Sequence, residues 1–330
     1  MSRLRKLFGY GRTDNNSNGF HPDRPPPEPY PAPNPYQPSS PTGARSEKPP
    51  QYPPPPFEPL PDGDDELPPP SFHGLHLTSP TSNAPSELAD AAWAFTDANA
   101  LAAPARLTAS ALAAIARGDI GLAPPPPSFR GLTTTATTTA GMSGGGAINV
   151  ASATGCRDCC LVSALPLYAA GYHYPPPLPS GGGGGAREIY FEVAVERVPA
   201  GAAIAIGFVA PPYPGFRLPG WNRGSVAVHG DDGRRYSNDA FGGKDFVRPF
   251  ADGQTVGLGI SFGPAGKRVW FTRDGAPEAA WRLDELRDSR EENDPLPGLD
   301  GACDVYAAVG IWGGGVKLQI RFHGERGKAC

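Results

Sequence analysis

The sequence predicts an all-β fold, an antiparallel β-sandwich built from the C-terminal two-thirds of a 330-residue chain. Segments between residues 187 and 322 alternate apolar and polar residues, which is the pattern of strands with one buried face. Turns rich in glycine and proline separate these segments at fairly regular spacing, as is typical of a sandwich. The first 80 residues hold 22 of the 43 prolines and therefore cannot build a sheet or a long helix.

Residues 1–83 are predicted to form a disordered, proline-rich arm with extended polyproline II conformation. The arm contains Pro49-Pro50-Gln51-Tyr52, which matches the PPxY motif that WW domains bind. A preformed polyproline turn loses little entropy on binding, and the side chain of Tyr52 fills a groove beside the prolines. The arm's composition alone predicts roughly 0.3 accidental matches, so Pro49, Pro50 and Tyr52 are candidate contacts for a WW domain.

Residues 84–117 are predicted to form a helical lead-in with two short helices. The first helix has Ser86 as its expected N-cap and Glu87 in its first turn. In the second, Thr108 is the expected N-cap and Gly118 the residue that ends the helix. We expect both helices to lie against the sandwich, although a free helical linker is the alternative.

Residues 118–326 are assigned to the sandwich, with low-complexity loop insertions near 133–150 and 175–186. The threonine run from Thr133 to Thr139 and the glycine runs belong to these insertions. The expected core consists of the apolar members of the alternating segments. These are Ile189, Phe191, Val193, Val195, Val256, Leu258, Ile260, Phe262, Val305, Ala307, Val309, Ile311, Leu318, Ile320 and Phe322.

The stretch around residues 213–246 carries the candidate binding residues. It is rich in the aromatic and arginine side chains that dominate the energetics of protein interfaces. Loops at one rim of a sandwich are held rigidly by the sheets, so these side chains are suited to contact a protein partner. At least half of the surface of Phe216 and Trp221 is expected to be buried, with Tyr213 and Arg223 nearer the surface. The predicted rim residues are Tyr213, Phe216, Trp221, Arg223, Asp231, Tyr236 and Phe241.

The sequence offers little that points to catalysis or to a cofactor. His229, Asp231 and Asp232 lie close together, but they occupy a hairpin in which aspartate serves the turn geometry. Cys156 and Cys159 have the C-x-x-C spacing of zinc or redox sites, yet no second such pair follows. We therefore expect no enzyme, no metal site and no cofactor.

Charge and cysteine usage narrow the expected setting and partners. The net charge of −4, with no basic stripe, argues against a nucleic-acid partner. No apolar run reaches the roughly 18 residues of a membrane-spanning helix, so no transmembrane anchor is expected. The odd number of cysteines, five, argues against a disulfide scaffold and favours a reducing, cytoplasmic setting.

Four stretches resemble the SPRY (B30.2-like) domain family, and more closely the fungal SPRY adaptor proteins that carry PPxY motifs. They are Ile189-Tyr190-Phe191-Glu192-Val193, the strand from Gly253 to Ile260, Phe271-Thr272-Arg273-Asp274-Gly275 and Tyr306-Ala307-Ala308-Val309-Gly310. The resemblance covers about residues 118–326 and implies a concanavalin-like sandwich that binds a protein partner. It also implies that the arm recruits a WW-domain ubiquitin ligase of the HECT class.

We therefore expect a non-enzymatic adaptor or interaction module. Two alternatives stay open at this point. One is a hydrolase or metal-dependent enzyme on a sandwich scaffold, and the other is a lectin-like, carbohydrate-binding domain.

Overall fold

The structure is a computed structural model that describes residues 85–125, 131–137, 146–173, 187–240, 242–263, 266–284 and 296–324. All of them lie within one compact unit, Pro53–Cys330. The predicted arm with Pro49, Pro50 and Tyr52, the insertion near 175–186 and Phe241 fall outside the described residues.

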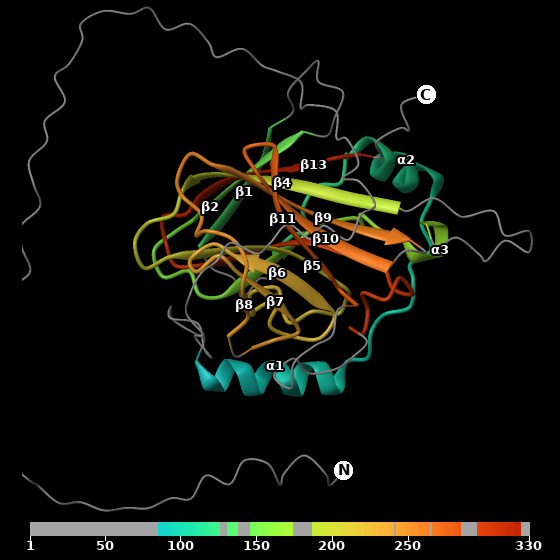
Figure 1. The fold of residues 1–330 in the computed structure, drawn as a ribbon, viewed down its shortest axis with the longest axis horizontal. Coiled ribbons are helices and arrows are strands. Elements are labelled where there is room, and N and C mark those ends of the chain that lie inside the picture. The colour runs from blue at the N-terminus through green and yellow to red at the C-terminus, as the bar shows by residue number, and fades with distance from the viewer. Residues whose placement is uncertain are drawn as a thin grey trace, which may run out of the picture. The chain divides into compact units, whose positions relative to one another are not determined.

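Two antiparallel sheets pack face to face, as the sequence predicts (Figure 1). The seven-stranded sheet has the order β1 (Leu132–Thr137), β2 (Ala147–Ser152), β13 (Lys317–Phe322), β4 (Arg187–Arg197), β9 (Thr255–Gly263), β10 (Gly266–Arg273) and β11 (Ala276–Arg282). The six-stranded sheet has the order β3 (Cys159–Val162), β12 (Tyr306–Trp312), β5 (Ala203–Val209), β6 (Ser225–His229), β7 (Arg234–Ser237) and β8 (Lys244–Asp245).

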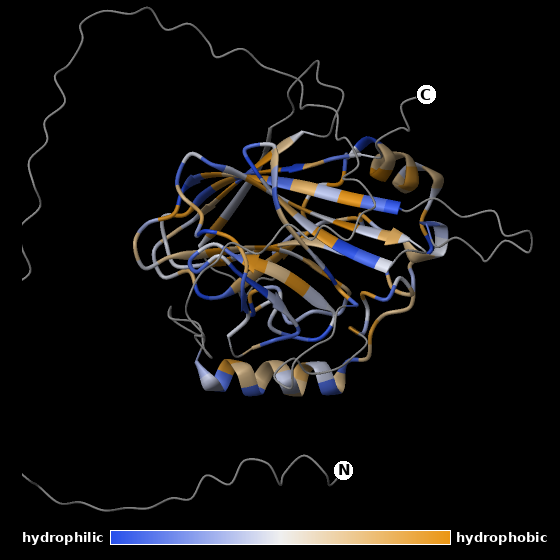
Figure 2. Ribbon diagram, in the orientation of Figure 1, coloured by the Kyte–Doolittle hydropathy of each residue, from blue (hydrophilic) through white to orange (hydrophobic). Residues whose placement is uncertain are grey.

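The main hydrophobic core fills the space between the sheets and contains every apolar strand residue predicted for it. Phe191 of β4 and Phe208 of β5 meet across the core edge to face, with ring centroids 5.3 Å apart. Bands of apolar and polar residues alternate along the strands in Figure 2. Because side chains of a strand point to opposite faces in turn, one set from each sheet is buried between the layers.

Within the described ranges three helices accompany the sheets, namely α1 (Ser86–Ala98), α2 (Ala109–Arg117) and α3 (Ala170–His173). Thr108 caps α2 as predicted, since its hydroxyl accepts a hydrogen bond from the backbone N–H of Ala111. Gly118 ends α2 with φ of 79°, and a Cβ there would lie 2.7 Å from the carbonyl oxygen of Phe322. The prediction for α1 is wrong by one residue, because Ser86 is already helical and Pro85 takes the N-cap position.

None of the helices within the described ranges is long and apolar enough to cross a membrane.

The loop insertion predicted near 133–150 is wrong for two of its segments, which are strands β1 and β2. β1 is a threonine-rich edge strand paired to β2, where Ile148 and Val150 enter the core. Threonine is β-branched and favours extended backbone, so the repeated residue that reads as loop filler is also a good strand former.

Candidate functional site

The outer face of the six-stranded sheet is covered by a loop, residues 211–222, which we call the covering loop. Two glycines of the sheet make room for it. A Cβ at Gly310 would lie 2.6 Å from Leu218 Cδ2, and one at Gly207 would lie 3.0 Å from Pro219 Cβ. The loop therefore rests directly on the sheet, and β5 and β6 are buried on both faces.

Polar contacts from β6 hold the covering loop in place. Nε2 of His229 lies 2.9 Å from the carbonyl oxygen of Pro219. The Ser225 hydroxyl accepts from the backbone N–H of Gly220 at 2.9 Å and donates to the carbonyl of Asn222 at 2.6 Å. Burial lowers the pKa of His229, so at neutral pH its ring is uncharged and acts as a structural support.

Trp221 and Tyr236 are predicted to contact a partner at the rim, but both side chains are buried in the structure. Trp221 is 5% exposed and Tyr236 is 2% exposed, and they form a small second core with Leu218 and Ala205. The reason is the covering loop, which turns the outer face of this sheet into an interior. The expectation that at least half of Trp221 is buried is confirmed.

Four half-buried aromatic residues of the described ranges belong to the covering loop and to the outward side of β12, and we call them the aromatic rim. Tyr213 and Phe216 come from the covering loop, and Tyr306 and Trp312 come from outward positions of β12. Tyr213 and Tyr306 pack together on a small apolar cluster that includes Val209. The Tyr213 hydroxyl donates to the carbonyl of Leu218 at 2.6 Å, which fixes its ring.

Sequence reasoning missed Tyr306 and Trp312 as site residues. Their signal is visible in the sequence, because they are the polar-side members of the alternating segment that ends at Trp312. Nothing local to that segment indicates that the covering loop lies beside them.

Arg223 and Asp231, the remaining described rim predictions, are placed differently. The Arg223 Nη2 atom donates to the backbone carbonyl of Asn99 at 2.6 Å, so this side chain holds the lead-in that follows α1. Asp231 is half-buried in the hairpin between β6 and β7. The lead-in is also held by a hydrogen bond from the N–H of Ala102 to the Pro211 carbonyl at 2.8 Å.

Two buried charged side chains, Arg217 and Asp158, lie beneath the aromatic rim. Arg217 is 2% exposed; its guanidinium stacks 4.3 Å from the centre of the Trp221 ring, and its Nε reaches Asn222 Oδ1 at 3.4 Å. Among the described residues, Arg217 Nη1 and Asp158 Oδ2 have no hydrogen-bond partner. Burial raises the pKa of Asp158 to about 6, although the positive charge of Arg217 acts in the opposite direction.

Continuing the register of β3 and β12 places Asp158 opposite Trp312, at the edge of the aromatic rim. The face thus offers aromatic surface above and one buried charge of each sign below. Such groups bind and orient a segment of another molecule; they do not form a nucleophile with its base.

The raised pKa of Asp158 predicts a pH-dependent contribution to stability. The folded protein holds this proton more tightly than the unfolded chain, so the free energy of unfolding falls as pH rises from about 4 to about 6 and then levels off. Asp158→Asn lacks this titration. The free energy of unfolding of the variant minus that of the wild type is therefore expected to rise by on the order of 2 kcal/mol between pH 4 and pH 7. Urea unfolding of both proteins across this pH range measures the difference; parallel pH profiles would contradict it.

No group of three or more His, Cys, Asp or Glu side chains in the described ranges is arranged to hold a metal ion. Cys156, Cys159 and Cys160 are buried free thiols, and Nδ1 of His173 accepts a hydrogen bond from the N–H of Ala169.

Comparison with known proteins shows which family and which proteins this sandwich is similar to. The SPRY domain family matches residues 188–282. The chain is 33% identical over 159 residues to the SPRY domain-containing protein C285.10c of Schizosaccharomyces pombe, a match that covers 48% of the chain and 36% of that protein. It is 34% identical over 125 residues to protein ssh4 of Neosartorya fischeri, which covers 38% of the chain and 23% of that protein. The chain therefore spans about a quarter to a third of the length of these relatives.

A crystal structure of a human SPRY domain is similar at 21% identity and a TM-score of 0.37, over 59% of this chain and 99% of that domain. The family match extends from the start of β4 to the end of β11 and includes the covering loop with its buried Trp221 and Arg217. Residues 188–282, from β4 to β11, therefore resemble a SPRY domain.

Proposed function

We propose that this chain is a non-enzymatic adaptor whose SPRY domain binds a segment of a protein partner at the aromatic rim. The observation that carries the proposal is the rim itself, formed by Tyr213, Phe216, Tyr306 and Trp312. Aromatic side chains on a preorganised surface contribute large contact area at little entropic cost. The covering loop supplies that preorganisation through its hydrogen bonds to β6.

The charged pair beneath the rim supports recognition of a polar group on the partner. Arg217 Nη1 is a donor without a partner among the described residues, and the side chain is held in place by Trp221. A carbonyl or carboxylate oxygen of a bound segment is the group that a guanidinium recognises best. The partner segment is accordingly expected to combine an apolar side chain with a neighbouring oxygen acceptor.

The second half of the proposal concerns Pro49-Pro50-Gln51-Tyr52. We propose that this motif recruits a WW-domain ubiquitin ligase, while the SPRY domain holds the protein to be modified. This proposal is supported by the match of the motif to the PPxY ligands of WW domains and by its position within a proline-rich tract. The bridge would act in the cytoplasm.

Peptide display against the purified full chain tests the rim. Selected peptides are expected to bind Phe216→Ala and Trp312→Ala at least about ten-fold more weakly than the wild type, the typical loss at an interface hot spot. Arg268→Ala, an exposed residue on the outer face of the other sheet, serves as the control. Equal affinity for all four proteins would place the binding site elsewhere.

The motif is tested in the same full-length protein with a tandem WW-domain fragment of a HECT ligase. Tyr52→Ala is expected to abolish binding. Tyr36→Ala is the matched control, because Pro33-Asn34-Pro35-Tyr36 lacks the adjacent proline pair. Unchanged binding of Tyr52→Ala would remove the adaptor hypothesis and leave an interaction module.

A further inference from the structure

Cys156 and Cys159 are held close together by the same neighbouring strand. Cys159 of β3 pairs with Ile311 of β12, and the Cys156 carbonyl accepts a hydrogen bond from the N–H of Gly313 at 3.1 Å. Ile311 and Gly313 are two positions apart, a span of about 7 Å along an extended strand. The two cysteines are therefore both held beside the same end of β12, and their side chains contact each other, as a disulfide between them requires.

Their side chains point into the same region. Both belong to the main core, whereas Cys160, the next residue of β3, points to the opposite face beside Val209 and Ala308. The Cys159 thiol donates to the carbonyl of Ile311 at 3.3 Å. Cys156 is 7% exposed in a turn whose neighbours Gly155 and Arg157 are exposed, so a small oxidant has a short path to it.

The two thiols differ in acidity. The neighbouring Cys159 side chain lowers the pKa of Cys156, and that contact together with burial raises the pKa of Cys159. The thiolate is the reactive form of cysteine. Cys156 is accordingly the attacking sulfur and Cys159 the resolving one.

We propose that Cys156 and Cys159 are a redox modification site, which a hydroperoxide converts to an intramolecular disulfide. The Cys156 thiolate attacks the peroxide O–O bond, forms an S–O bond as sulfenic acid and releases hydroxide. The Cys159 sulfur then attacks the Cys156 sulfur, an S–S bond replaces the S–O bond, and the second hydroxide leaves. The proton of Cys159 and the one already released convert both hydroxides to water. Two thiols are oxidised while one peroxide is reduced to two waters.

A reversible disulfide of this kind suits a reducing compartment, where cytosolic disulfides are transient and often redox-sensing. The turn that it closes carries Asp158 between the two cysteines, at the base of the aromatic rim. The chemical test below does not depend on partner binding, so its failure is separate from failure of the proposed function.

The full chain is treated with hydrogen peroxide, its remaining thiols are alkylated, and it is digested with trypsin without reduction. Trypsin cleaves after Arg157 and so separates Cys156 from Cys159. We expect the peptides of residues 131–157 and 158–187 to stay joined, with the loss of two hydrogens, and to separate after dithiothreitol.

Three variants assign the sulfurs. Cys160→Ser is expected to keep the joined peptides, while Cys156→Ser and Cys159→Ser are expected to lose them. Thermal unfolding of each variant confirms that it is folded before oxidation. Joined peptides that persist in folded Cys159→Ser, or a wild-type Cys156 that advances to sulfinic acid with Cys159 still alkylated, would overturn the proposal.

Discussion

Replacing Trp221 by alanine is expected to lower the free energy of unfolding by about 4 kcal/mol, the usual cost of truncating a buried tryptophan. The indole is 5% exposed and packs against Leu218, Tyr236 and the guanidinium of Arg217. Its removal opens a cavity between the covering loop and the sheet, and leaves Arg217 without its aromatic support. Urea denaturation of the wild type and the variant measures the change.

Phe216→Ala is the matched comparison, because Phe216 is another aromatic residue of the covering loop but is half-buried. We expect it to cost about 1 kcal/mol or less, in keeping with partly exposed positions. If Trp221→Ala were as mild as Phe216→Ala, Trp221 would contribute no more than a half-buried residue, and Trp221, Tyr236, Leu218 and Ala205 would not act as a second core.

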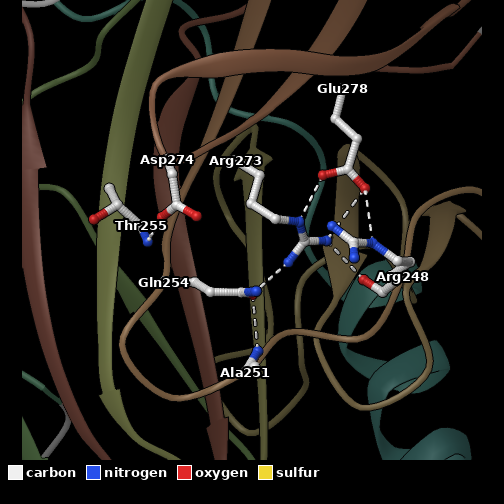
Figure 3. Close-up of polar contacts among 7 residues, drawn as sticks. All are labelled: Arg248, Ala251, Gln254, Thr255, Arg273, Asp274 and Glu278. Atoms are coloured by element: carbon white, nitrogen blue, oxygen red, sulfur yellow. Dashed lines mark hydrogen bonds and ion pairs between the residues drawn. The ribbon is translucent and has the colours of Figure 1, made fainter.

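Replacing Arg273 by alanine is expected to lower the free energy of unfolding by about 3 kcal/mol, because it removes a buried guanidinium and leaves the half-buried Glu278 carboxylate without its partner. Figure 3 shows the guanidinium between Glu278, Gln254 and the backbone of Arg248. Its Nε donates to Glu278 Oε2 at 2.6 Å, its Nη1 to Gln254 Oε1 at 2.5 Å and its Nη2 to the Arg248 carbonyl at 2.8 Å. The side chain thus joins the β10–β11 hairpin to the loop that precedes β9.

Arg268→Ala on the same strand removes an exposed arginine and is expected to change stability by less than about 0.5 kcal/mol. The midpoint of urea unfolding, measured side by side, separates the two variants. Indistinguishable midpoints would show that the network of Arg273 contributes no more than a surface charge.

The strands were predictable because their signal is local. In β4, Ile189, Phe191, Val193 and Val195 alternate with more polar residues, and all four are buried in the core. Alternation of apolar and polar residues arises in any strand with one buried face, so the sequence of a single strand is enough to recognise it. The predicted fold class, an antiparallel β-sandwich, is confirmed by the two sheets of the structure.

The site was harder to predict because it depends on contacts between distant residues. Trp221 is buried because the covering loop lies on Gly207 and Gly310, and Gly310 is 89 positions after Trp221 in the sequence. The continuous apolar character of Ala203–Val209 is the one local sign that β5 is covered on both faces. Arg223 is bound to Asn99, a partner that no pattern around Arg223 indicates.

The bond between Arg223 and Asn99 has a mechanical consequence for the chain's N-terminal part. α1 is 13 residues long, hence about 20 Å, and its C-terminal end is fastened to the sandwich by Asn99. A force applied at the N-terminal end of α1 is therefore passed along the helix to Asn99 and through Arg223 into the sandwich.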